Sequence, residues 1–194
     1  MQVQANKRRL LCAGAGLTVL AAAAGCTTTS GSGGDPAARR KEIDVAADSA
    51  LSRLYREAPG SQELVNAARG TLVFPTVVSA GFLVGGSRGQ GVLRKGGKSA
   101  RFYTMTEASV GLLAGAQSQA VFILFMNEEA LRRFEASNGW TVGADGSITF
   151  IGAGLDARIT TQTARQDIVG FVLTNGGLMA SISLNGNRIT PLAI

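Results

Sequence analysis

The sequence predicts an α+β domain with a strongly curved, mainly antiparallel β-sheet, either open or partly closed into a barrel, packed with a few helices. Glycine supplies 26 of the 194 residues, and much of it falls inside strand-like stretches. There it weakens a strand unless it allows a bend, a bulge or close backbone approach. Dipeptides that favour tight hairpins separate these stretches. They are Gly96-Gly97, Asp145-Gly146, Asn175-Gly176 and Asn185-Gly186.

The first 25 residues read as a signal peptide that precedes the fold. Positive charges at residues 7–9 are followed by an apolar run from Leu10 to Ala24. This run is shorter than the roughly 20 residues that a transmembrane helix needs. Small residues end it directly before Cys26. The pattern predicts cleavage at this point, with a retained membrane anchor as the alternative.

The ending Ala23-Ala24-Gly25-Cys26 resembles a bacterial lipobox. In that motif the cysteine is lipidated and becomes the new N-terminus, and two or more acyl chains anchor a protein stably. Thr27 follows, in place of the aspartate that resembles an inner-membrane retention signal. We therefore expect a lipoprotein of the outer membrane that faces the periplasm. Residues 26–36 would be its lipidated tether, because Ser- and Gly-rich segments are flexible.

Residues 37–194 are expected to form one domain that begins with its longest helix. Asp35 is a candidate N-cap and Pro36 suits the first helical position. Apolar residues recur at helical spacing along this helix, while charges of both signs share its polar face. That pattern favours a helix that packs on a core over one that lies on a membrane. The expected helices are Ala37–Glu57, Ser61–Ala68 and Asn127–Ser137.

Most of the remaining domain reads as strand. Ala120–Met126 and Asp167–Thr174 are apolar on both faces, which is typical of central strands. Apolar and polar residues alternate from Leu178 to Leu184, as in a sheet with one wet face. Trp140 is expected to begin a strand at the edge of the core.

The residue inventory excludes several functional classes. The chain has no histidine, and cleavage would leave Cys26 as its one cysteine. Ser-His-Asp and Cys-His catalysis, histidine metal ligands and an internal disulfide are therefore excluded. The formal charge of +6 includes three basic residues of the signal segment, so the mature chain is less basic. We expect no nucleic-acid partner, no metal and no cofactor.

Two short motifs are interpreted as structural. Gly85 to Gly89 matches G-x-S-x-G, but the chain offers no histidine base for a nucleophile elbow. Gly91 to Ser99 is similar to a phosphate-binding loop, but its spacing is wrong and its context is a hairpin. Carboxylates at Glu107, Asp156 and Asp167 leave a hydrolase as a third alternative, which would need two of them to converge in one pocket.

The densest charge surrounds the Gly96-Gly97 turn. One interpretation is a solvated hairpin tip. The other is a tip that contacts phosphate, since each cation near an anionic lipid surface contributes about 1 kcal/mol. Glycine also lets a backbone approach a headgroup closely. The candidate headgroup contacts are Arg94, Lys95, Lys98 and Arg101, with Arg69 and Arg88 farther out.

Blocks in the same order along the domain resemble the SYLF family. They are Arg69–Pro75, Ala80-Gly81-Phe82 with Gly85-Gly86, Gly89–Leu93, Gly111–Gln117, Gly139–Gly143 and Gly177–Gly186. The resemblance implies a lipid-binding module. Eukaryotic relatives bind phosphoinositides and some bind actin, whereas bacterial relatives are secreted or lipid-anchored. Ser79 and Gly176 stand where the family often has lysine, which favours a bacterial phospholipid over a phosphoinositide.

The sequence thus favours a non-enzymatic, lipid-anchored periplasmic protein whose partner is anionic membrane phospholipid. The alternative is a structural or protein-interaction lipoprotein of the envelope with no lipid ligand. That alternative predicts a contiguous exposed apolar patch and an envelope protein partner.

Overall fold

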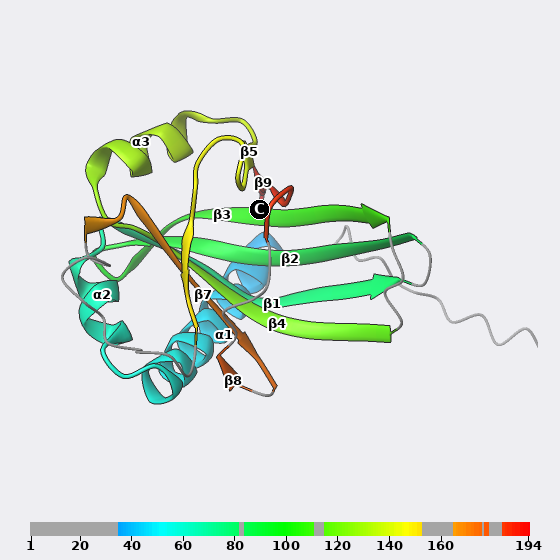
Figure 1. Cartoon of the computed structure of the whole chain (residues 1–194), viewed down its shortest axis with the longest axis horizontal. Coiled ribbons are helices and arrows are strands. Elements are labelled where there is room, and N and C mark those ends of the chain that lie inside the picture. The colour runs from blue at the N-terminus through cyan, green and yellow to red at the C-terminus, as the bar shows by residue number, and fades with distance from the viewer. Residues whose placement is uncertain (1–34, 82–83, 111–114, 153–164, 176, 179–183) are drawn as a thin grey trace, which may run out of the picture. The chain divides into compact units, whose positions relative to one another are not determined.

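A computed structural model of the chain describes residues 35–81, 84–110, 115–152, 165–175, 177–178 and 184–194. Residues Gly34–Ile194 form one compact unit. It contains the helices α1 (Pro36–Glu57), α2 (Ser61–Ala67) and α3 (Glu128–Ala136) (Figure 1). Its strands are β1 (Gly70–Gly81), β2 (Val84–Lys95), β3 (Lys98–Val110), β4 (Gly115–Phe125), β5 (Trp140–Thr141), β6 (Thr149–Ile151), β7 (Ile168–Thr174), β8 (Gly177–Leu178) and β9 (Arg188–Pro191).

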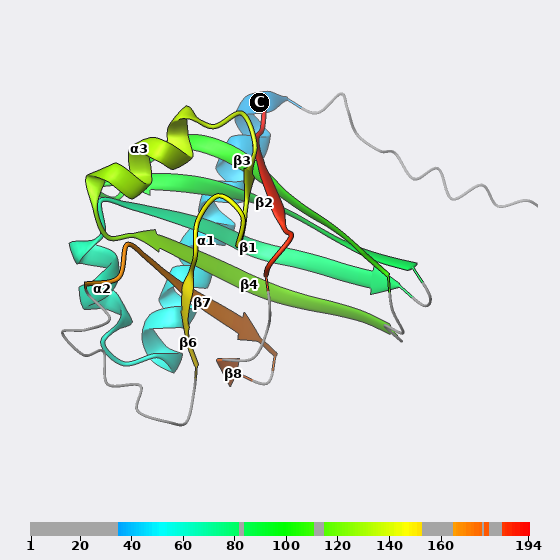
Figure 2. The same cartoon turned by 45° about the horizontal axis from the view of Figure 1, so that its top comes forward.

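The structure confirms the α+β class and the curved sheet. The strand order is β5-β9-β3-β2-β1-β4-β7-β6, with β8 paired to β7. The β6–β7 pair is parallel, and the other named strand pairs are antiparallel. The sheet curls so strongly that Trp140 from one end and Phe150 from the other pack against the same core (Figure 2).

Both faces of the sheet are covered. We call the face toward α3 the inner face and the face toward α1 the outer face. Successive side chains of β4 point to opposite faces: Ile123 packs in the core on the α3 side, and Phe122 packs in the core on the α1 side. Burial on both faces explains why residues 120–126 are apolar at successive positions. The prediction that this stretch is a central strand is confirmed, because β4 lies between β1 and β7.

The sequence signals for the helices are confirmed. The Asp35 carboxylate accepts a hydrogen bond from the Ala37 amide at 3.0 Å, and Pro36 is the first helical residue. Asn127 caps α3 in the same way, by accepting from Ala130 N at 2.8 Å. The apolar stripe of α1 is buried against the outer face, so this helix packs on the core as expected. Its members are Ile43, Ala47, Ala50, Leu51 and Leu54.

The strand glycines confirm the expected close approaches. Gly91 lies on β2 where the neighbouring β1 strand carries Phe74, and a Cβ at this position would come within 2.6 Å of the phenyl ring. The β1–β2 register shifts between Val73 and Thr76. Pro75 lies at this bulge, where its missing amide hydrogen breaks no ladder bond.

One turn differs from the prediction made for Asp145-Gly146. The left-handed residue is Gly143, with φ +89°. The Asp145 carboxylate accepts from Thr141 N at 2.6 Å, so it closes this turn through its side chain. Gly186 has the expected positive φ of +89°. Residues 1–34, Gly176 and most of the 178–184 alternation lie outside the described residues.

Alkaline pH is expected to destabilise the fold partly through Tyr103, which is 2% exposed. Burial raises the pKa of this phenol, although the nearby Arg101 opposes the shift. An unfolded tyrosine titrates near pH 10. Between that value and the raised folded pKa, the unfolded chain releases a proton that the folded chain keeps. Stability from this group is therefore complete below about pH 10 and is lost as the pH rises through the window.

Urea unfolding between pH 8 and 11 tests this prediction. Tyr103→Phe should lose less stability over the range than the wild type, by at most about 1.4 kcal/mol for each pH unit inside the window. Some decline should remain, because burial also raises the pKa of Tyr55. Equal pH slopes in the two proteins would contradict the assignment.

Candidate functional site

The basic hairpin predicted from the sequence joins β2 to β3. Lys95 pairs with Lys98 across a turn made by Gly96 and Gly97, whose φ values are +54° and +76°. A Cβ at either glycine would meet no atom within 4 Å. The turn is therefore open to solvent, and its conformation favours glycine. The hairpin context of Gly91–Ser99 is the predicted one, and it differs from the strand-loop-helix unit of a nucleotide-binding P-loop.

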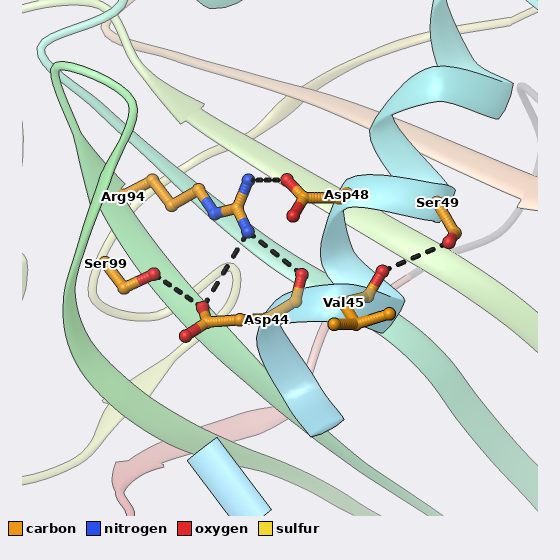
Figure 3. A network of polar contacts seen from close by, with 6 residues as sticks. All are labelled: Asp44, Val45, Asp48, Ser49, Arg94 and Ser99. Carbon is orange, nitrogen blue, oxygen red and sulfur yellow. Dashed lines mark hydrogen bonds and ion pairs between the residues drawn. The ribbon is translucent and has the colours of Figure 1, made fainter. Parts of the chain in front are cut away.

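Arg94 is held by α1 on the outer face (Figure 3). Its Nη1 donates to the Asp48 carboxylate at 2.5 Å, and its Nη2 donates to the Asp44 carbonyl at 3.0 Å. The Asp44 carboxylate also lies 3.7 Å from Nη2 and accepts from Ser99 Oγ at 2.5 Å. The Arg94 side chain is only 12% exposed. Helix α1 thus neutralises the first cation of the hairpin.

The next residue points to the opposite face. Lys95 Nζ lies 2.8 Å from a carboxylate oxygen of Glu135 on α3. Successive side chains of a strand alternate between faces, so Arg94 and Lys95 connect one hairpin to the helices on both sides of the sheet. Of the four clustered candidates, these two therefore have ion-pair partners in the described part of the chain.

The other candidates have different surroundings. Lys98 is exposed and has no ion pair in the described part of the chain. Arg101 lies over the Tyr103 ring, with its Cζ 5.8 Å from the centroid. Arg69 is exposed directly before β1, one residue after the pocket-lining Ala68. Arg88 lines a separate depression on the outer face, of about 380 Å³, between α1 and the β1 bulge.

A pocket of about 520 Å³ opens beside the hairpin turn. Helices α1 and α2 form one side, and Thr71 and the β2–β3 turn form the other. Its wall mixes apolar and polar groups, among them Leu51, Tyr55, Val65, Asn66, Arg94 and Gly97. Burial raises the pKa of Tyr55 and the Arg94 charge opposes the shift, so this phenol is a neutral O–H group at neutral pH.

The remaining chemical candidates lie elsewhere. Ser87 of the G-x-S-x-G match lies within β2, far from any strand-to-helix turn. Its Oγ lies 3.3 Å from Glu107, which also accepts from Asn187 at 3.2 Å. Asp167 instead accepts from Asn127 at 2.5 Å, near the other end of the sheet. Glu107 and Asp167 therefore have separate partners, and Asp156 lies outside the described residues.

Sequence analysis missed the partners of the hairpin and one wall of the pocket. Asp44 and Asp48 are four residues apart and share a helix face, which is a visible signal for a basic partner. Their partner is 46 to 50 residues away, and nothing local indicates which cation it is. Val65 and Asn66 reach the pocket only because α2 lies beside α1 and the hairpin.

These features define a class: a curved-sheet α+β domain with a ligand-sized pocket next to a basic hairpin. Residues 106–192 match the Ysc84 family, described as Las17-binding protein actin regulator. This match confirms the SYLF resemblance for that stretch, and the family is associated with lipid or actin binding. The stretch begins within β3, so it leaves out α1, α2 and the hairpin turn. No curated protein matches the chain.

Proposed function

We propose that the protein binds anionic phospholipid at the hairpin turn and the pocket beside it, as a lipid-anchored protein of the outer membrane facing the periplasm. One observation carries the proposal: a mixed polar and apolar pocket of about 520 Å³ opens beside the Gly96-Gly97 turn, and the next residue, Lys98, is exposed and without an ion pair in the described residues. Pockets of this size are typical of small-molecule sites. A phospholipid offers both an anionic and an apolar part to such a site.

The cations of the hairpin differ in how readily they can bind a phosphate, because some of them already form ion pairs. Because Arg94 and Lys95 already face carboxylates, a phosphate gains little from them over the contacts that they have. Lys98 is the nearest cation in sequence that is free to bind an anion, and Arg69 stands close to the α2 side of the pocket. The Gly96-Gly97 backbone between them lets a headgroup approach without side-chain obstruction.

Anchoring supports the function through effective concentration. Acyl chains on Cys26 would hold the domain near the bilayer by a short tether, and this raises the local lipid concentration. A weak intrinsic affinity is then sufficient. Among the described residues, no helix has the length and apolar character required to span a bilayer, and the anchoring role rests on the lipobox resemblance.

A protein partner is the second candidate, and the family description favours it. The words Las17-binding and actin regulator describe proteins that act through protein contacts. In the described residues, the large apolar side chains that are exposed are Val45 and Val78. Two such side chains in the described part of the chain are fewer than the contiguous patch of a large protein interface contains. We therefore rank lipid binding first.

Lys98→Ala is expected to weaken binding to anionic vesicles about fivefold, because a cation at an anionic surface contributes about 1 kcal/mol. The assay is co-sedimentation of residues 26–194 carrying Cys26→Ser, which lack both the signal segment and the acylated thiol, with vesicles of phosphatidylglycerol and phosphatidylcholine. Binding should fall with added salt, since screening weakens exposed charges.

Lys41→Ala is the matched control. Lys41 is exposed on α1 and has no ion pair within the described residues, so the variant loses the same charge away from the turn. It should bind within about twofold of the parent protein. Equal losses in the two variants would show that net charge, and not the hairpin, drives binding. Equal binding to pure phosphatidylcholine vesicles would refute the function itself.

A further inference from the structure

We infer that the pocket receives the acyl-ester region of a single phospholipid, with the Nε–H of Arg94 donating to an ester carbonyl. This inference rests on the proposed function and specifies how the lipid enters the fold. It distinguishes a protein that takes a lipid partly out of the bilayer from one that only touches headgroups.

One N–H donor of the Arg94 guanidinium, at Nε, has no acceptor among the described residues. The two terminal nitrogens bind Asp48 and Asp44, and every dashed line from Arg94 in Figure 3 starts from one of them. The Nε is buried and has no hydrogen-bond partner in the described part of the chain. A buried donor without an acceptor is costly. Arg94 also lines the pocket, so a pocket ligand with an oxygen acceptor would remove that cost.

The electrostatics favour a neutral acceptor over a phosphate. Asp48 itself lines the pocket, and Asp44 stands on the same side of the guanidinium. An anion placed against Nε would be repelled by two carboxylates that already balance the Arg94 charge. An ester carbonyl accepts a hydrogen bond without adding charge. The phosphate is better placed at Lys98, beyond the turn.

The rest of the wall fits a hydrocarbon chain. Leu51, Val65 and Ala68 line the pocket. Leu51 belongs to the core cluster on the outer face, and Val65 and Ala68 are partly buried side chains that pack against that cluster. The pocket wall therefore combines apolar side chains with a residue whose buried Nε donor lacks an acceptor, and the exposed Lys98 follows the pocket-lining Gly97 in sequence. A glycerophospholipid joins an acyl chain, an ester and a phosphate in one molecule, so it offers a group to each of these features.

The first test uses soluble lipids, so that no bilayer is present. Isothermal titration of residues 26–194 carrying Cys26→Ser would compare monomeric dihexanoyl phosphatidylglycerol with its deacylated headgroup. Each buried methylene contributes about fourfold in affinity, so three methylenes predict a preference of about 60-fold for the acylated lipid. A dihexyl ether analogue, which lacks the carbonyls, should bind about tenfold more weakly than the ester.

Two substitutions locate the binding. Val65→Trp fills the pocket and should abolish the preference for acylated lipid. Val45→Trp makes the same change on an exposed part of α1, where Val45 is 58% exposed, and should preserve it. Arg94→Lys keeps the charge but removes Nε, so it should remove the ester-over-ether preference. Circular dichroism and thermal unfolding establish that each variant is folded, and the wild-type lipid comparison needs no variant.

The outcomes separate this inference from the proposed function. Salt-sensitive vesicle binding without any preference for acylated over deacylated lipid would overturn the inference and leave the headgroup function standing. Ester and ether lipids of equal affinity would remove Arg94 Nε from the site. Loss of vesicle binding by the Cys26→Ser protein would refute the function as well, and a protein partner would then be the better candidate for the pocket.

Discussion

Gly91→Ala is expected to lower the free energy of unfolding by about 3 kcal/mol, at the upper end of the usual cost of overpacking. Gly91 lies on the central strand β2, where the added methyl group would overlap the carbonyl oxygen of Val73 and the Phe74 ring. The obstructing oxygen belongs to the backbone of a paired strand, so it cannot move aside by a rotamer change. Relief would require the β1 bulge to shift.

Urea denaturation followed by circular dichroism measures this effect, with Gly96→Ala as the matched control. Gly96 has a positive φ of +54° but open space around it. That variant should lose only about 1 kcal/mol, from backbone strain. A cost for Gly91→Ala no greater than for Gly96→Ala would show that β1 and β2 can separate without penalty, and would contradict the close approach.

Phe134→Ala is expected to cost about 3–5 kcal/mol, the range for deleting a buried phenyl ring. Phe134 projects from α3 into the concave inner face and is 1% exposed. Its ring centroid lies 4.9 Å from that of Tyr103, 4.8 Å from Phe125 and 5.8 Å from Trp140. One truncation therefore leaves a cavity between β3, β4, β5 and α3, and aromatic contacts are lost with it.

Phe102→Ala provides the comparison for the same assay. Phe102 lies on β3 and is only partly buried, on the outer-face side. We expect its truncation to cost less than half as much. If both substitutions cost the same, the aromatic cluster under α3 would not be the main anchor of that helix, and the Lys95–Glu135 ion pair would need a larger role.

Much of the fold could be predicted from local patterns. The caps at Asp35 and Asn127, the apolar stripe of α1 and the doubly apolar β4 each lie within one short stretch of chain. Such signals act between neighbours in sequence, so they are readable without a structure. The turn at residues 141–146 is the exception, because a side-chain contact from Asp145 moved the left-handed glycine to position 143.

The candidate site divides in the same way. The cluster of cations around Gly96-Gly97 was visible in the sequence, and the structure places it at a hairpin turn as expected. The sequence did not show that carboxylates of α1 and α3 occupy Arg94 and Lys95. From the sequence, the four cations were expected to be equivalent. In the structure, Lys98 and Arg101 have no ion pair among the described residues, unlike Arg94 and Lys95. Their roles in binding remain predictions.

By itself, the sequence determined the fold class, the helices and the central strands, since periodicity and capping are set by residues a few positions apart. Only the tertiary structure decided which cations stay free and where a pocket forms. Arg94 meets Asp44 and Asp48 because α1 crosses the outer face at one particular register. That register depends on packing between segments about 50 residues apart, where a small shift of the helix would exchange one ionic partner for another.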